Sequence, residues 1–129
     1  MLAAVMESPG HIVVKEIATP SAGPGEVLLK VEACAICGTD QRVLNGEKPV
    51  DVPIVGHEIA GRAVAVGAGV EGVRVGDRYA VQTVIGCNTC PSCAAGRQNL
   101  CENGFQAIGY QFDGGFAEYM VMPKCGVDQ

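Results

Sequence analysis

Residues 27–40, V-L-L-K-V-E-A-C-A-I-C-G-T-D, combine the pattern of a strand with two cysteines that follow it. Apolar residues occupy every second position at first, and Lys30 and Glu32 lie between them. Because the side chains of a strand alternate between two faces, this pattern predicts a half-buried strand. Its predicted buried face consists of Val27, Leu29, Val31 and Ala33. The segment C-A-I-C-G-T-D then lies at a strand-to-helix junction.

The rest of the chain also predicts short strands joined by turns. Leu2–Glu7 and His11–Ile17 have the pattern of a hairpin around Ser8-Pro9-Gly10, which is a turn signal. A loop over residues 20–25 leads into the strand that begins at Val27. Further strand regions are expected at Ile59–Val66, Val73–Val84 and Gly115–Met122.

The best candidate for a helix is short, from Thr39 to about Leu44. Thr39 or Asp40 is its predicted N-cap, and Asn45-Gly46 is its predicted end. Many short strands, 18 glycines and hardly any helix indicate a mainly β fold, as a small barrel or sandwich.

Length and composition restrict the class of protein. The 129 residues predict one domain, and a hydrophobic content of 48% with 18% charged residues is typical of a globular chain. A net charge of −5 argues against binding to nucleic acid or to an anionic membrane. No apolar run approaches the roughly 20 residues of a membrane-spanning helix, and the N-terminus lacks a signal-peptide pattern. Seven cysteines, an odd number, favour metal-bound thiolates in a reducing cytoplasm over a disulfide framework.

Four cysteines crowd into one short run, G-C-N-T-C-P-S-C-A-A-G-R-Q-N-L-C, over residues 86–101. Two-residue gaps let the first three thiolates face a common point, and a seven-residue excursion returns the chain with a fourth. Zn²⁺ accepts four sulfurs in a closed tetrahedron, which leaves no open position for substrate. We therefore expect Cys87, Cys90, Cys93 and Cys101 to hold a structural zinc in a lobe over about residues 86–104.

Residues 67–72, G-A-G-V-E-G, fit the dinucleotide-binding pattern G-x-G-x-x-G by letter only. That fingerprint requires a helix directly afterwards and an acidic residue about 20 positions later. The sequence V-R-V-G-D-R-Y-A-V follows instead, with the alternation of a strand. We expect a connecting turn here, and no nucleotide-binding half in this chain.

A second constellation joins Cys34 and Cys37 to Gly56-His57-Glu58, which begins the next predicted strand. A thiolate and an imidazole at such positions suit a zinc site that keeps a place for substrate. A redox C-x-x-C pair or two buried structural thiols are the alternatives, although the long helix of a thioredoxin-like motif is not predicted. Spacing alone leaves these interpretations open.

Five motifs, taken in order, resemble the N-terminal, GroES-like catalytic domain of the zinc-containing medium-chain alcohol dehydrogenases. They are C-A-I-C-G-T-D (34–40), V-P-I-V-G-H-E-I-A-G (52–61), V-G-A-G-V-E-G-V-R-V-G-D-R (66–78), the four-cysteine loop, and D-G-G-F-A-E-Y (113–119). The resemblance implies that residues 1–129 form one GroES-like barrel with short helices and a zinc lobe. Gly38, after the second cysteine, resembles the polyol, threonine and secondary-alcohol branch of the family.

The resemblance also implies roles for individual residues. Cys37 and His57 would be ligands of a catalytic zinc, and Glu58 would be a carboxylate able to approach or transiently ligate it. Asp40 would engage the other ring nitrogen of His57 and fix its tautomer. Thr39 would hydrogen-bond the substrate oxygen and pass on its proton. Cys34, Cys125 and His11 match no ligand position, and His11 is expected at the surface or at a strand edge.

The implied activity is Lewis-acid catalysis by zinc, with hydride transfer from a secondary alcohol, polyol or hydroxy amino acid to NAD or NADP. Two departures from the family stand out. Arg42 occupies the position of a frequent proton-relaying histidine and cannot relay in the same way. The family's third zinc ligand and its whole Rossmann domain would come from chain beyond Gln129, as in an excised domain or a natural remnant. We therefore expect the isolated chain to be inactive, and a full-length form to be a homo-oligomer.

Two other classes of protein stay open at this stage. One is a non-enzymatic zinc-binding module that uses the GroES-like barrel for protein association. The other is a rubredoxin-like electron carrier, although rubredoxins pair two C-x-x-C knuckles far apart in sequence, unlike the compact run over residues 86–101.

Overall fold

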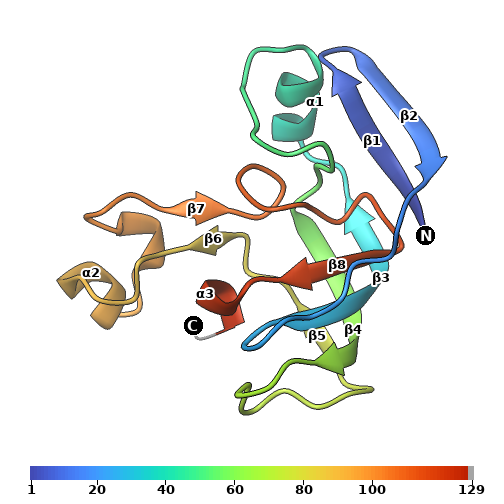
Figure 1. The fold of residues 1–129 in the computed structure, drawn as a ribbon. Coiled ribbons are helices and arrows are strands. Elements are labelled where there is room, and N and C mark those ends of the chain that lie inside the picture. The colour runs from blue at the N-terminus through green and yellow to red at the C-terminus, as the bar shows by residue number, and fades with distance from the viewer. Residues whose placement is uncertain (128–129) are drawn as a thin grey trace.

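A computed structural model describes residues 1–127 of the chain, which are built mainly from short antiparallel strands (Figure 1). The strands are β1 (Leu2–Ser8), β2 (His11–Glu16), β3 (Val27–Ala35), β4 (Glu58–Val66), β5 (Arg78–Ala80), β6 (Val84–Ile85), β7 (Gln106–Ala107) and β8 (Tyr119–Met122). The helices are α1 (Gly38–Leu44), α2 (Pro91–Ala94), the 3-10 turn η1 (Gln98–Leu100) and α3 (Lys124–Val127). The predicted mainly β fold is confirmed.

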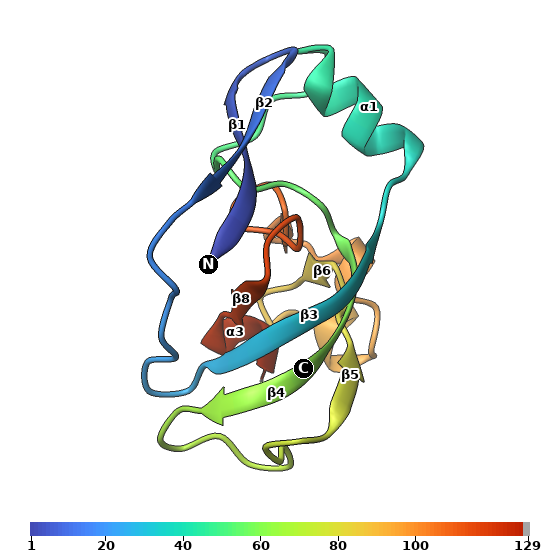
Figure 2. The same ribbon diagram turned by 90° about the vertical axis from the view of Figure 1, so that its right-hand side faces the viewer.

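Three groups of strands make up this fold. The central antiparallel sheet has the order β5-β4-β3-β8, β1 and β2 form a separate hairpin, and β6 pairs with β7. Figure 2 shows the long strands β3 and β4 side by side, with the hairpin and α1 at one end. In Figure 1, β6 and β7 run away from this sheet toward α2. The cysteine run is therefore carried on an arm that projects from the sheet.

The alternation at the start of β3 builds the main hydrophobic core. Val27 and Leu29 are each 3% exposed, and they pack with Ile59, Ala63 and other buried residues of the sheet. A β-bulge then shifts the register against β4 between Val31 and Ala33. Because a bulge moves later side chains off the original face, the prediction that Ala33 is buried is wrong: it is exposed. The prediction holds for Val27 and Leu29, and Val31 is partly buried.

Helix α1 begins one residue earlier than predicted, and its N-cap is Cys37 rather than Thr39 or Asp40. The Cys37 sulfur accepts a hydrogen bond from the Thr39 amide at 3.3 Å. The Asp40 carboxylate accepts one from the Cys37 amide at 2.9 Å, which completes a capping box. The expected end is confirmed, because Asn45 is the C-cap and Gly46 follows with φ +76°.

Other predicted elements differ from the structure in extent. The hairpin of β1 and β2 is confirmed, as is a turn, without a helix, over residues 67–72. The predicted strand 73–84 is wrong in its length, because a turn at Val75-Gly76 delays β5 to Arg78 and a gap separates β5 from β6. The predicted strand 115–122 pairs regularly only from Tyr119 onward.

No helix among residues 1–127 is long and apolar enough to cross a membrane.

Two glycines bring the chain close to itself beside the segment that carries His57. Gly56 adopts φ +91°, a left-handed conformation that L side chains rarely take. Gly114 faces the carbonyl oxygens of Val55 and Gly56, where a Cβ would lie closer than van der Waals contact. The Gly114 amide also donates to the Ile54 carbonyl at 2.7 Å. The close packing at Gly114 therefore fixes the backbone of residues 54–56, which lead into His57.

We expect Gly114→Ala to lower the free energy of unfolding by about 2 kcal/mol, because the new methyl group must push rigid backbone aside. Urea unfolding followed by circular dichroism measures this. Gly38→Ala is the matched control: Gly38 lies in α1 and a Cβ there meets nothing within 4 Å. Equal losses in the two variants would show that the close approach at Gly114 is unimportant.

Candidate metal centres

The four cysteines predicted to bind a structural zinc lie together at the tip of the arm. The sulfurs of Cys87, Cys90, Cys93 and Cys101 are all within 4.8 Å of one another. Backbone amides point at them: the Cys90 amide donates to the Cys87 sulfur at 3.4 Å, and the Cys93 amide to the Cys90 sulfur at 3.4 Å. None of the seven cysteines, all of which lie within residues 1–127, forms a disulfide. This arrangement is a set of four converging sulfur ligands.

Hydrogen bonds and burial act in opposite directions on this cluster. Hydrogen bonds from Thr89, and then from Asn103 and the Cys90 amide, lower the pKa of Cys87 to about 5. Burial raises the pKa of Cys93 to about 12. One thiol therefore ionises readily, whereas another keeps its proton unless a cation compensates the charge. A divalent metal that prefers sulfur, such as zinc, supplies that compensation with its own charge.

The second candidate site depends on the pairing of β3 with β4. Cys37 lies between β3 and α1, and His57 directly precedes β4. Because Ala35 pairs with Glu58 in the antiparallel register, the two flanking segments meet. The Cys37 sulfur lies 3.1 Å from His57 Nε2. The Thr83 hydroxyl donates to the His57 carbonyl at 2.7 Å and holds the backbone there.

Behind the imidazole lies the buried carboxylate of Asp40, which is 7% exposed, while His57 is 9% exposed. One Asp40 oxygen is 3.4 Å from His57 Nδ1. The contact lacks hydrogen-bond geometry, so Nδ1 is a buried nitrogen without a hydrogen-bond partner. A metal on the Nε2 side would place the proton on Nδ1, facing Asp40, as in the carboxylate–histidine–metal arrangement. The residues present therefore fit a zinc ion.

The other candidate residues lie outside these two groups. Glu58 is exposed and does not join Cys37, Asp40 and His57 in the second group. Burial raises the pKa of Cys34 to about 11, which keeps that thiol protonated and argues against a redox pair with Cys37. Cys125 packs against the central core. His11 lies on the exposed face of β2, as predicted, 3.5 Å from Glu7.

Arg42 occupies the position where the resemblance suggests a relay histidine. Its side chain faces Glu47, just after the C-terminal end of α1. Its guanidinium lies 3.4 Å from the Glu47 carboxylate, and both side chains are largely exposed. Arg42 is not among the residues that line the cavity beside Cys37 and His57.

That cavity has a volume of about 390 Å³ and opens beside the imidazole. Its lining includes Thr39, Lys48, Thr83, Phe105, Tyr110 and Gln111. The Tyr110 ring lies 5.5 Å from that of His57. Burial raises the pKa of Tyr110, the negative charges of Asp40 and Cys37 raise it further, and a hydrogen bond with Thr39 lowers it. The phenol therefore stays neutral beside the candidate metal centre.

Sequence reasoning did not predict Lys48, Thr83 or Tyr110 in this cavity. Lys48 lies in the loop after α1, Thr83 directly before β6, and Tyr110 in a turn after β7. None of the three stands in a recognisable motif next to Cys37 or His57. Only the folded chain brings these separate loops together.

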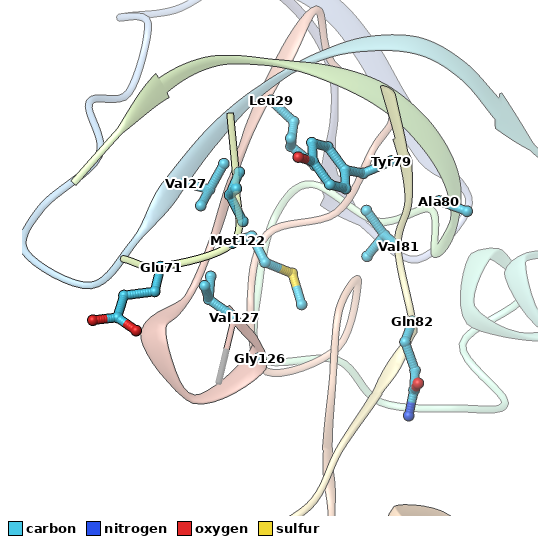
Figure 3. Close-up of a pocket in the computed structure, with 12 residues that line it drawn as sticks. Val27, Leu29, Glu71, Tyr79, Ala80, Val81, Gln82, Met122, Gly126 and Val127 are labelled. Atoms are coloured by element: carbon cyan, nitrogen blue, oxygen red, sulfur yellow. The ribbon is translucent and has the colours of Figure 1, made fainter. Parts of the chain in front are cut away.

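A second hollow, of about 430 Å³, lies against the central sheet near α3 (Figure 3). Val27, Leu29, Val81 and Met122 line it with apolar groups. Glu71 is the one carboxylate of the lining, and Figure 3 shows it pointing away from the other labelled side chains. The Tyr79 hydroxyl accepts a hydrogen bond from the Arg74 amide at 3.1 Å. This hollow contains no converging set of metal ligands.

Comparisons with known proteins agree with this geometry. The family model of the alcohol dehydrogenase GroES-like domain matches residues 23–127. An L-threonine 3-dehydrogenase of Pyrococcus horikoshii is 42% identical over 129 residues, which is 95% of this chain and 37% of that protein. The chain therefore spans little more than a third of the length of this curated relative.

Solved structures show the same fold. A cobalt- and zinc-bound thermostable alcohol dehydrogenase from Pyrobaculum aerophilum has a TM-score of 0.87 and 36% identity, over 95% of this chain and 39% of that one. A short chain alcohol dehydrogenase from Escherichia coli, in complex with NADH, has a TM-score of 0.85 and 38% identity, over 98% of this chain and 37% of that one.

We expect the chain to retain about one zinc after extensive dialysis, because four thiolates bind far more tightly than the Cys37–His57 pair. Cys93→Ser should lose that zinc, whereas Cys34→Ser, which alters a cysteine outside the cluster, should keep it. Elemental analysis measures both and also detects iron, which a rubredoxin-like carrier would hold. Two tightly held zinc ions, or zinc retained by Cys93→Ser, would contradict this assignment.

Asp40→Asn should weaken metal binding at the Cys37–His57 pair by about 10-fold or more, because the buried charge facing Nδ1 is lost. The amide oxygen can still accept the hydrogen bond from the Cys37 amide, so α1 should keep its cap. Titration of the zinc-loaded chain with Co²⁺, followed by visible absorption, measures the affinity. Asp77→Asn removes a half-exposed carboxylate beside Arg74 and should leave it unchanged; equal affinities for Asp40→Asn and the unaltered chain would refute the role of Asp40.

Proposed function

Given that the chain belongs to the family of alcohol dehydrogenase GroES-like domains, we propose that it is the catalytic domain of a zinc-dependent alcohol dehydrogenase. The resemblance read from its motifs is thereby confirmed at the level of the family. One observation carries the functional proposal: a thiol and an imidazole meet at 3.1 Å, with a buried carboxylate behind the imidazole and a cavity beside it. That arrangement suits a metal centre open to a small substrate.

Cys37 and His57 would hold the catalytic zinc, and the exposed carboxylate of Glu58 could approach it. Bound zinc acts as a Lewis acid that makes an alcohol more acidic. Asp40 orients His57 from behind and holds the proton on Nδ1. Phe105 and Tyr110 contribute ring surface to the lining of the cavity. Cys87, Cys90, Cys93 and Cys101 would hold a second zinc that only maintains the shape of the arm.

Thr39 is the proposed acceptor of the proton from the substrate hydroxyl. It lines the cavity together with His57 and Tyr110, and its interaction with the Tyr110 phenol lowers the pKa of that group. A hydroxyl both donates and accepts, so it can take a proton from a substrate oxygen while passing its own to a neighbour. Arg42 is turned toward Glu47, which leaves Thr39 and Tyr110 as the hydroxyl pair at this site.

The hydride acceptor would be NAD or NADP, bound by a Rossmann domain outside these residues. Residues 67–72, the only G-x-G-x-x-G pattern in the sequence, form a turn in the structure. Residues 1–129 would thus be one domain, with its zinc lobe over about residues 86–104. Its substrates would be secondary alcohols, polyols or hydroxy amino acids, since a threonine dehydrogenase is among the relatives. The absence of disulfides among residues 1–127 suits the cytoplasm, and the whole enzyme would be a homo-oligomer.

We expect alcohol-dependent reduction of NAD⁺ or NADP⁺ by the protein in its natural length, and none by residues 1–129 alone. Thr39→Val should lower kcat by about 100-fold or more, because the substrate proton loses its acceptor. Thr19→Val changes an exposed threonine and should retain full activity. Absorbance of the reduced nicotinamide measures these rates. A natural-length protein that binds zinc but oxidises no alcohol would favour the non-enzymatic module instead.

A further inference from the structure

Among residues 1–127, Lys48 is the one lysine or arginine that lines the cavity beside His57. The cavity lining carries no carboxylate. Lys48 itself is half-buried, and a strongly hydrated ammonium usually stays in water unless something favours its position. The neighbouring residues determine what holds the ammonium at this cavity and what it can bind there.

An aromatic ring holds the ammonium in place. Lys48 Nζ lies 4.2 Å from the centre of the Tyr110 ring, within the range of a cation–π interaction. The same ring lies 5.5 Å from the ring of His57, tilted by 38°. Tyr110 is 7% exposed, so its position is set by packing. The Tyr110 ring thus has both the Lys48 ammonium and the His57 imidazole as neighbours.

The ammonium has no anionic partner of its own. Among residues 1–127, no carboxylate lies within 4.0 Å of Lys48, whereas Lys15 lies 2.8 Å from Glu7. An ammonium has three hydrogen-bond donors, and a contact with the face of a ring satisfies none of them fully. Those donors are available to a molecule in the cavity.

The other polar side chains of the lining already have partners within the fold. Thr83 donates to the His57 carbonyl at 2.7 Å, and Thr39 interacts with the Tyr110 phenol, whose pKa it lowers. Gln111 accepts from the Ala107 amide at 3.0 Å and donates to Asp51 at 3.4 Å. Lys48 is therefore the polar group of this cavity with the most unused capacity for a ligand.

We propose that Lys48 binds an anionic group of the substrate, a carboxylate or a phosphate, and so selects alcohols that carry such a group on the same carbon skeleton. This inference rests on the proposed function, because it takes the cavity as the substrate site. The hydroxyl would face Cys37, His57 and Thr39, while the anionic group would face Lys48. A cavity of about 390 Å³ accommodates a small hydroxy acid or a sugar phosphate.

The test compares charged and neutral ligands of matched shape in the zinc-loaded chain. The ligands are 3-hydroxybutyrate with butane-1,3-diol, and glycerol 3-phosphate with glycerol. Amide chemical shifts of Lys48, Tyr110 and Gln111, recorded by NMR during each titration, give the dissociation constants. We expect at least one charged ligand to bind roughly 10- to 100-fold more tightly than its neutral partner, as a hydrogen bond to a charged group provides.

Lys48→Met should abolish that preference, and Lys48→Arg, which keeps the charge, should restore most of it. Lys30→Met is the matched control, because Lys30 is exposed on β3 and does not line the cavity; it should behave as the unaltered chain. A preference for 3-hydroxybutyrate alone identifies the anionic group as a carboxylate, and one for glycerol 3-phosphate alone identifies a phosphate. Equal binding of charged and neutral ligands, or a preference that survives Lys48→Met, would overturn the proposal.

These measurements require no hydride transfer, so they separate the two proposals. In one outcome, anion binding depends on Lys48 but the natural-length protein oxidises no alcohol. That result would overturn the proposed function, and Lys48 would then be part of an anion-binding site without dehydrogenase activity. An active dehydrogenase in which Lys48→Met leaves the KM of charged alcohols unchanged would overturn only the role of Lys48.

Discussion

The pairing of β3 with β4 is the interaction on which the rest of the site depends. The two strands are joined along most of their length, from Val27 opposite Val66 to Ala35 opposite Glu58. Beyond this last pair, β3 continues through Cys37 into α1, and His57 directly precedes β4. The backbone ladder, and the hydrophobic core beneath Val27 and Leu29, thus place a thiol beside an imidazole. No local segment of the sequence could do this alone, because the two ligands are 20 residues apart.

The sequence predicts those features of the fold and the site that depend on local periodicity and on the spacing of residues. Alternation at Val27 and Leu29 located the core face, and the spacing of Cys87, Cys90 and Cys93 located the cluster. The bulge that exposes Ala33 was not predictable, because it depends on the register against another strand. The same holds for the cap at Cys37, where a sulfur took the place that hydroxyl and carboxylate side chains usually occupy. Lys48 and Tyr110 meet only through tertiary structure.

The two groups of potential ligands differ in how the fold supports them. The four-cysteine cluster is contained within one short segment, and its amides point at its own sulfurs. The Cys37–His57 pair is assembled from distant segments, with Asp40 behind the imidazole and a cavity beside it. A self-contained cluster suits a permanent structural ion. A pair built across two strands, with one side open, suits a centre at which ligands exchange.

Cys37 serves two purposes at once, because its sulfur caps α1 and also faces His57 Nε2. Capture of a cation by that sulfur and the winding of the first helical turn are therefore thermodynamically linked. Thr39, the proposed proton acceptor, lies in that same turn, so the loading of a metal at Cys37 would also affect its placement. Serine at this position could preserve the helix and lose the ion, which leaves a thiol as the side chain that satisfies both demands.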